Sequence, residues 1–294
     1  MEITELFERF FFKQREEYVL NIFEIFTKKN RILLKAMVST DFKLRYQQSV
    51  LGYLWSILKP LLLFTIMYFV FVKFMRFGDG IPHFAVALLL GIVMWNFFNE
   101  TTTGGMMSIV GHGDLLRKIH FSKYVVVIAS SMSALINFGL NFIVVIIFML
   151  INGVHLTWSC LLIVPLILEL YILALGIAFF LSAVYVNLRD LNPIWEVVMQ
   201  AGFYATPIIY PISMISSRGG MWGPIVAKLD LILNPVAQIV QDARYVLVDQ
   251  ANVTVWQMEG NHVLAAWPIL FSILIFFAGL WYFTAKSKHF AELV

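Results

Sequence analysis

Long apolar runs, separated by shorter polar segments, dominate the pattern of hydrophobic and polar positions along the chain. Six of these runs reach the length of about 20 mainly apolar residues that a helix needs to cross the hydrocarbon core of a bilayer. Because unpaired backbone groups are not tolerated in lipid, the runs predict an all-α integral membrane protein with six transmembrane helices. The expected spans are residues 53–74, 83–104, 124–151, 158–186, 193–210 and 263–284.

A basic segment rich in hydrogen-bonding side chains precedes the first run. We expect residues 31–49 to form a helix at the membrane surface, because Leu34, Val38 and Phe42 recur at a helical spacing. Gly52 would then allow a close turn into the first span. Residues 1–30 indicate an additional amphipathic cytoplasmic helix. The chain therefore divides into an N-terminal extension, residues 1–30, and a transmembrane domain, residues 31–294.

The connection between the fifth and sixth runs, residues 211–261, is long and partly apolar. It contains the segments MWGPIVAKLDLIL and NPVAQIVQDARYVLV, each too short to span a bilayer. In the second segment, Asn234 fits the N-cap and Pro235 the first position of a helix. Two interpretations are open: re-entrant or interfacial helices on the external side, or an external amphipathic lid without a transport role.

Composition supports a membrane protein, and the positions of the charges orient it. Of the 294 residues, 60% are hydrophobic and 13% are charged, whereas a soluble domain carries about 25% charged residues. Lys and Arg gather before the first span, between the second and third spans, and in the tail. This bias predicts that both termini are cytoplasmic. The first thirty residues hold no uninterrupted apolar stretch, so no cleaved signal peptide is expected.

Polar side chains recur on one face of the third predicted span. Ser130, Ser133, Asn137 and Asn141 fall within about 80° of one another on a helix. Small and hydrogen-bonding residues commonly mediate helix–helix packing in membranes, and we favour that interpretation. A wall facing a pore is the alternative.

The fifth predicted span combines a carboxylate, an amide and aromatic rings. Glu196, Gln200 and Phe203 share one face, with Tyr204 and Tyr210 nearby. An ionisable residue within a span usually faces a cavity or a partner. The combination suits a path for sugars, in which hydroxyls would meet the polar groups and pyranose faces would lie on the rings. A lipid-facing aromatic belt is the alternative. Weaker candidates of the same kind are Asn99, Glu100 and Glu169.

Sequence motifs for nucleotide binding and for hydrolytic chemistry are missing. The chain has no G-x-x-x-x-G-K-[ST] phosphate loop, no H-E-x-x-H or G-x-S-x-G motif and no D-x-D pair. We therefore expect no enzymatic activity, metal or cofactor in this chain. The connection between the second and third spans, residues 111–123, is a candidate contact for a partner protein. Residues 114–119 could form a short amphipathic helix there, with an ordinary solvated loop as the alternative.

Five segments of the sequence, in order among the six spans, resemble one known family. They are RYQQSVLGYLWSILKPLL, LRKIHFSKYVVV, NLRDLNPIWEVVMQAGFYATPIIYP, ILNPVAQIVQDARYVLV and KHFAEL. These segments resemble the membrane subunit of type-2 ABC transporters, specifically the permeases that export bacterial O-antigen, capsular polysaccharide or teichoic acid. The resemblance covers the chain from about Leu33 to its end.

The resemblance implies an assembly and a cargo. In that family two copies of the permease pair around a central path in the bacterial cytoplasmic (inner) membrane. Two separate ATP-binding subunits dock below them and carry ATP and Mg, so no cofactor is expected in this chain. The cargo would be an undecaprenyl-linked glycan polymer, with membrane lipids as further partners and no nucleic acid. The resemblance also favours the re-entrant interpretation of residues 211–261.

The resemblance implies roles for particular residues as well. Contacts with the ATPase would be made by Asp114, Leu115, Leu116, Arg117 and Lys118. The cytoplasmic start of the fifth span would be marked by Arg189 and Asp190. A diphosphate head group would meet Arg45, Trp55 and Lys59, with ordinary anchoring to lipid headgroups as the alternative. Apart from the resemblance, the polar and aromatic faces of the third and fifth spans predict a substrate path lined by Asn137, Asn141, Glu196, Gln200, Phe203, Tyr204 and Tyr210.

Two other functions stay open at this point. A type-2 ABC permease for drugs or small lipids would share the fold, although the aromatic fifth span argues against it. A stand-alone membrane transporter or enzyme would need related repeats or a catalytic cluster, and neither is evident in the sequence.

Overall fold

The computed structural model describes residues 27–46, 51–52, 54–119, 121–155, 157–288 and 290. Within these ranges every regular element is a helix, and five helices are long and apolar enough to span a membrane. A sixth span is present only if the two helical segments between residues 220 and 247, which are bent against each other, are counted as one span. The five are α3 with its π-helical extension η2 (Leu54–Met67 and Tyr68–Phe74), α4 (Phe84–Gly111), α6 (Tyr124–Ile151), η3 with α7 (Trp158–Leu162 and Ile163–Tyr185) and α14 (Trp267–Ser287).

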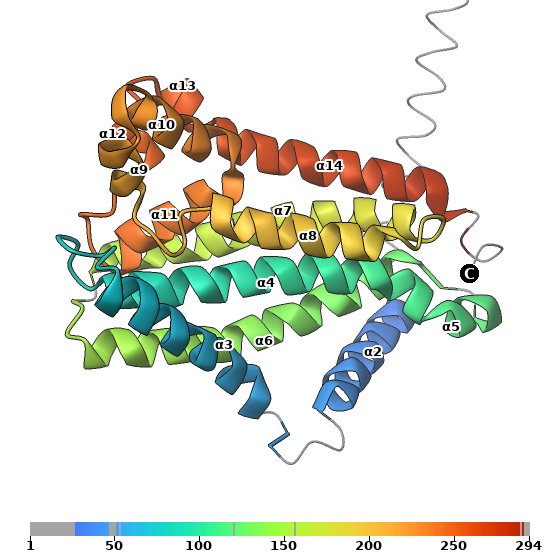
Figure 1. Cartoon of the computed structure of the whole chain (residues 1–294). Helices are drawn as coiled ribbons and strands as arrows, with labels where there is room; N and C mark the ends of the chain where they lie inside the picture. Colours follow the sequence, from blue (N-terminus) through green and yellow to red (C-terminus); the bar gives the residue numbers. More distant parts are fainter. Residues whose placement is uncertain are drawn as a thin grey trace, which may run out of the picture.

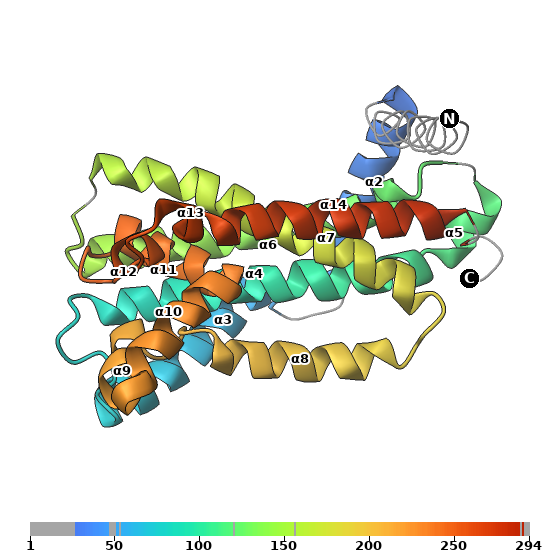
Figure 2. The same ribbon diagram turned by 90° about the horizontal axis from the view of Figure 1, so that it is seen from above.

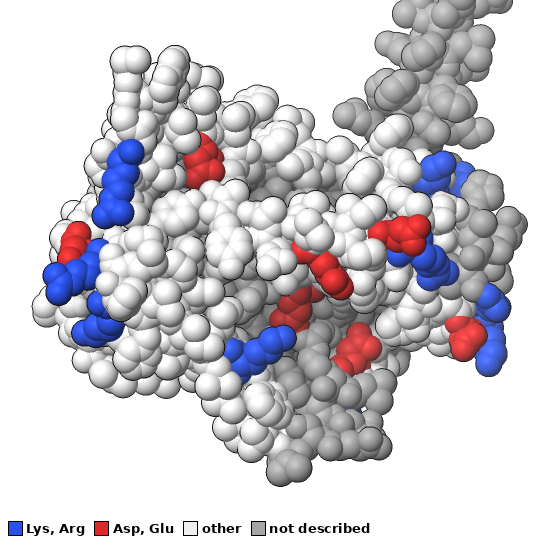
Figure 3. Space-filling view, viewed as in Figure 1, with Lys and Arg blue, Asp and Glu red and all other residues white. Residues whose placement is uncertain are grey.

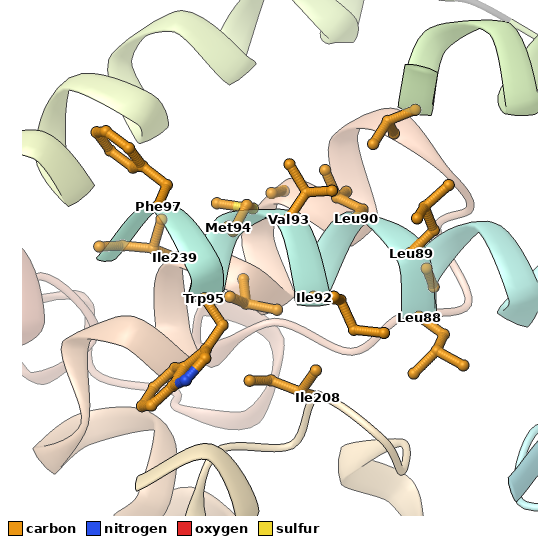
Figure 4. Packing of buried hydrophobic residues seen from close by; sticks show 14 of the residues in the cluster. Leu88, Leu89, Leu90, Ile92, Val93, Met94, Trp95, Phe97, Ile208 and Ile239 are labelled. Carbon is orange, nitrogen blue, oxygen red and sulfur yellow. The ribbon is translucent and has the colours of Figure 1, made fainter. Parts of the chain in front are cut away.

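Helix α4 lies at the centre of the bundle. It packs against both α6 and α7, and α14 covers α7 (Figures 1 and 2). Leu88, Ile92 and Trp95 point away from α4 into one buried cluster, which also contains Ile208 and Ile239 (Figure 4). Lipid tails are as apolar as these side chains, so close van der Waals packing rather than exclusion of water favours the cluster.

Two glycines bring α7 and α14 into close contact. A Cβ atom on Gly279 would overlap the carbonyl oxygen of Gly176, and a Cβ atom on Gly176 would overlap the backbone of Phe276. Small residues at such a crossing let two backbones approach and so increase the packing between membrane helices. The crossing therefore depends on the absence of a side chain at both positions.

The predicted fifth span is shorter than expected. Helix α8 (Leu191–Ala205) ends five residues before Tyr210, so that predicted boundary is wrong. Thr206 is extended, with ψ of 135°, because a following proline disfavours the helical conformation. With 15 residues, α8 is not among the five long spans. The last span is displaced too, since α14 begins at Trp267 after the short α13 (His262–Ala265).

A group of short helices follows α8 at one end of the bundle (Figure 1). Asn234 caps α11 as predicted, because its side-chain oxygen accepts a hydrogen bond from the Ala237 N–H at 3.2 Å. The helices before and after Asn234 are bent by 99°. A broken span and a re-entrant loop share this geometry, so the re-entrant interpretation stays a prediction. The group comprises α9 (Ile212–Arg218), η4 (Gly220–Trp222), α10 (Gly223–Leu233), α11 (Pro235–Leu247), α12 (Val255–Met258) and α13.

The opposite end of the bundle carries α2 (Lys28–Tyr46) and α5 (Gly113–Lys118) (Figure 1). Helix α2 packs against α6, and its Met37 is buried in a cluster with Ile109 and Tyr124. Gly52 has a φ of +50°, which agrees with the predicted close turn. The predicted end of the surface helix at residue 49 and almost all of the N-terminal extension lie outside the described residues.

Candidate functional site

A cavity of about 1010 Å³ opens between α3, α4, α6 and α8. The space-filling view shows a hollow in this face of the molecule, with both acidic and basic side chains around it (Figure 3). Aromatic side chains in the lining are Trp55, Trp95, Phe97, Phe138, Phe203 and Tyr204. Polar side chains in the lining are Ser56, Lys59, Asn96, Asn99, Glu100, Thr103, Asn137, Asn141, Glu196 and Gln200.

The cavity brings together residues that the sequence places far apart. Three helices contribute them: α3 supplies part of the predicted head-group site, and α6 and α8 supply most of the predicted substrate path. The predicted residues in the lining are Trp55, Lys59, Asn137, Asn141, Glu196, Gln200, Phe203 and Tyr204. Their shared location makes one continuous site, and their individual roles stay predictions.

The two asparagines of α6 connect helices and also line the cavity. Asn137 donates a hydrogen bond to the Glu100 carboxylate on α4 at 2.6 Å. Asn141 donates to the Ser56 carbonyl on α3 at 3.1 Å and to the Asn137 carbonyl within α6 at 2.9 Å. Both interpretations of this polar stripe therefore apply to Asn137 and Asn141, which join neighbouring helices and also line the cavity.

Contacts with α4 hold α8 in place as one wall of the cavity. The Trp195 indole donates a hydrogen bond to the Thr102 hydroxyl at 3.3 Å. Gly202 lies so close to Trp95 that a Cβ atom there would be 2.9 Å from the ring. Phe203 then meets Trp95 edge to face, with ring centroids 6.0 Å apart. The wall presents an aromatic surface whose ring orientation is set by neighbouring rings.

The charged groups among the described lining residues are one ammonium and two carboxylates. Lys59 comes from α3, and Glu100 and Glu196 come from α4 and α8. Glu196 accepts a hydrogen bond from the Asn192 side chain at 3.0 Å. Carboxylates and amides can bind hydroxyl groups, and an ammonium can bind phosphate oxygens. The site thus offers contacts for a ligand that combines hydroxyls, flat apolar faces and an anionic group.

Other predicted residues lie elsewhere. Tyr210 is outside the cavity, and its hydroxyl donates a hydrogen bond to the Tyr204 carbonyl at 2.8 Å, near the end of α8. Arg189 and Asp190 are exposed before α8, with the Arg189 guanidinium 5.5 Å from the Tyr185 ring centroid. The side chain of Arg45 lies outside the described residues.

The short helix predicted near residues 114–119 is present as α5. Leu116 is buried and Leu115 partly buried against the cluster that contains Met37, whereas Asp114, Arg117 and Lys118 face outward. The helix is therefore anchored by its apolar side and presents a charged side. Contact of that side with an ATPase stays a prediction.

An ion pair between α2 and the end of α4 lies close to α5. His112 Nε2 is 3.7 Å from the Asp41 carboxylate, and His112 Nδ1 lies 2.9 Å from the Ser108 carbonyl. The Asp41 carboxylate raises the pKa of His112 above its usual value of 6.5, with the Ser108 carbonyl acting in the same direction and partial burial opposing both. When protonated, the His112 imidazole therefore ties α2 to the end of the central helix α4.

Sequence reasoning missed several lining residues of α4. Trp95 looked like one of many apolar residues in its run, although it lines the cavity and contacts Phe203 on α8. Asn96 and Thr103 were also missed, although they share one helix face with Glu100, which the sequence had already singled out as a weaker candidate. This helical spacing of polar residues could have identified the lining face of α4 from the sequence. The same spacing identified the polar face of the third predicted span.

The fold and the site define a multi-pass membrane protein with a polar and aromatic cavity between its spans. The sequence matches the family described as ABC-2 type transporter over residues 32–228, which is more than half of the chain. The chain therefore belongs to the ABC-2 type transporter family, and the family resemblance seen in its motifs is confirmed.

Named relatives extend this assignment. The chain is 28% identical to the O-antigen export system permease protein RfbA of Myxococcus xanthus, over 90% of this chain and 96% of the relative. It is 30% and 32% identical to two proteins of the same name from Klebsiella pneumoniae, in each case over 63% of this chain and 71% of the relative.

Proposed function

We propose that this chain is the permease subunit of an ATP-driven exporter of a lipid-linked polysaccharide, such as O-antigen or capsule, or of teichoic acid. The similarity to O-antigen export permeases carries the proposal, because in the Myxococcus xanthus protein it extends over nearly the full length of both chains. The cavity adds support, since its rings can lie against pyranose faces while its amides and carboxylates bind hydroxyls.

The cargo would pass along the cavity wall formed by α6 and α8. Gln200 and Glu196 are exposed, and Asn137 and Asn141 lie opposite on α6. Lys59, together with Arg45 and Trp55, would meet the diphosphate of the lipid carrier where the polymer starts. A long chain needs a continuous path rather than a closed pocket, and a cavity open to the surface is compatible with that need.

The exporter would be a homodimer with two ATP-binding subunits. Exposed apolar residues on α3 and α8, among them Leu62, Ile66 and Val197, form surface that lipid or a second copy must cover. The ATP-binding subunits would hold ATP and Mg and would contact the charged side of α5. Closure of these subunits would then move α5 and α2 and separate the two halves of the path.

The orientation follows the distribution of Lys and Arg in the sequence. The end with α2, α5 and the C-terminal part of α14 would face the cytoplasm, and α9 to α13 would lie on the external side of the bacterial cytoplasmic membrane. The bend of 99° at Asn234 would then form a re-entrant hairpin.

The test joins a genetic and a biochemical measurement in the native host. Deleting the gene should remove the surface polymer and leave polymer on its lipid carrier inside the cell, and the intact gene should restore export. Purification of the tagged chain in mild detergent should recover an ATPase with a phosphate loop at one copy per permease.

Other outcomes would replace the proposal. A deletion strain with normal surface polymer but altered sensitivity to drugs would favour a small-molecule permease. A purified chain without any ATPase, under conditions that keep other membrane complexes intact, would favour a stand-alone transporter.

A further inference from the structure

A second polar cluster lies apart from the cavity, where α7, α11 and α14 meet. Glu169 comes from α7, and Gln238 and Asp242 lie one turn apart on α11. Ser272 of α14 and Trp256 of α12 lie beside these carboxyl groups. None of these residues lines the cavity, so the proposed transport path does not explain them.

The cluster has more hydrogen-bond acceptors than donors. The Gln238 amide donates a hydrogen bond to one Asp242 carboxylate oxygen at 2.7 Å. Both residues are buried, with Gln238 1% and Asp242 7% exposed. Three buried oxygens have no hydrogen-bond partner among the described residues: Glu169 Oε1, Gln238 Oε1 and Asp242 Oδ1. Each buried acceptor without a donor costs about 1–3 kcal/mol.

Nearby charged groups do not neutralise the two carboxyls. Arg244 is fully buried on the same helix, but its guanidinium donates to the carbonyls of Ala87, Pro207 and Ile208 and to the Gln241 side chain. On neighbouring elements, the Tyr171 hydroxyl pairs with Ser131, the Cys160 thiol faces the Val246 carbonyl, and Lys228 pairs with Glu259. Asp230 on α10 adds a further carboxyl rather than a cation.

Two ionised carboxylates here would repel each other and would each lose hydration, the buried Asp242 more than the partly exposed Glu169. One added proton reduces both the repulsion and the loss of hydration. It removes one negative charge and turns one acceptor oxygen into a donor. The carboxyl O–H would offer a donor in a cluster where three oxygens have none among the described residues. A proton is therefore the smallest ligand that satisfies the cluster.

We propose that Glu169, Gln238 and Asp242 form a proton-binding site in which the two carboxyls share one proton. The bound proton links α11, the buried helix after the bend, to α7 and, through the contact of Glu169 with Ser272, to α14. Loss of the proton places two negative charges between these helices and loosens α11. The site makes the packing of α11 sensitive to pH.

Infrared spectroscopy of the purified protein in its native complex tests the site directly. At neutral pH we expect a C=O stretching band of a protonated carboxyl that shifts in D₂O and disappears as the pH rises. The double variant Glu169→Gln/Asp242→Asn should lose this band, and each single variant should shift or remove it. Asp79→Asn, a matched change at an exposed carboxylate, should leave it unchanged.

Thermal unfolding supplies a second measurement. Because the folded protein holds a proton that the unfolded chain releases above about pH 4, the folding equilibrium constant should fall by up to about tenfold per pH unit as the pH rises toward the pKa of the site, and it should level off above that pKa. The double variant should lose this slope. Absence of the band in the unmodified protein, or its persistence in the double variant, overturns the proposal. So does a stability that depends on Na⁺ at constant ionic strength and pH.

Discussion

Helices α3 and α4 differ in what surrounds them more than in how apolar they look. In α4, 78% of the residues in its apolar 18-residue stretch are buried within the chain, compared with 6% in α3 and η2. Yet α4 is the less apolar of the two by mean hydropathy. A helix surrounded by protein can carry polar groups because neighbouring helices satisfy them, whereas a helix facing lipid cannot.

The polar residues of α4 illustrate this difference. Glu100 accepts a hydrogen bond from α6, and Thr102 accepts one from α8. In contrast, α3 exposes Leu62 and Ile66, and η2 exposes Phe69. These side chains need lipid or a second copy as a neighbour. Stability should therefore reside mainly around α4, and variants near the two helices should have unequal effects.

The largest effect should come from Arg244, which anchors α11 to α4 and to the segment after α8. Replacing it with Met removes the guanidinium donor from the carbonyls of Ala87, Pro207 and Ile208, of which Ala87, inside α4, keeps its helical backbone hydrogen bond. Two orphaned acceptors at about 1–3 kcal/mol each predict a loss of at least about 2 kcal/mol of unfolding free energy. Thermal unfolding in detergent measures it, with Arg218→Met at an exposed position as the control. Equal stability of the two variants would contradict the anchoring role.

A similar loss is expected at the crossing of α7 and α14. Gly279→Ala introduces a Cβ atom that overlaps the carbonyl oxygen of Gly176, so two backbones must separate. Overpacking of this kind costs about 1–3 kcal/mol, and we expect the upper part of that range. Gly139→Ala on α6 is the matched control, because nothing lies within 4 Å of a Cβ atom there. A stable Gly279→Ala protein would show that the crossing can widen at little cost.

The sequence alone predicts most of the fold and little of how its parts meet. Five spans follow from the length of apolar runs, and the turn at Gly52 and the N-cap at Asn234 follow from local chemistry. Helix α8 ends early because Pro207 follows Thr206. A hydropathy pattern averaged over many residues does not show the effect of a single proline. The length of an apolar run also cannot distinguish the central helix α4 from the peripheral helix α3. It shows that the side chains must leave water, but not whether protein or lipid will surround them.

The candidate site shows the same limit. Helical periodicity collected Glu196, Gln200 and Phe203 on one face, but no periodicity states that this face meets Lys59 across a cavity. Arg244 lies in the connection between the fifth and sixth predicted spans, where nothing in the sequence distinguishes it from a surface charge. Its carbonyl partners lie 36 to 157 residues away along the chain, so only the folded structure reveals that it is buried.

A smaller, pH-dependent effect is expected where α2 joins the end of α4. The pKa of His112 is raised in the folded protein, so the stabilisation is complete below about pH 6.5 and is lost as the pH rises through the folded value. The side chains of His112 and Asp41 are 28% and 25% exposed, which limits the gain to about 1 kcal/mol. His112→Gln should flatten this part of the pH profile of thermal unfolding, and His262→Gln at an exposed site should not. An unchanged profile in His112→Gln would assign the pH dependence to another group.

Replacement of Gln200, which lines the cavity, should have the smallest effect on stability. The same replacement should have a clear effect on transport. Its side chain is exposed on α8 and lines the cavity, so Gln200→Ala should change the unfolding free energy by less than about 0.5 kcal/mol. Export should nevertheless fall several-fold if polymer hydroxyls bind this amide, and surface polymer measured per copy of the permease reports that rate. Asn152→Ala removes an exposed amide at the far end of α6, outside the cavity, and should not change export. Equal export by both variants would mean that the cargo does not contact α8, and the cavity would then be a gap between helices that a second copy or lipid fills.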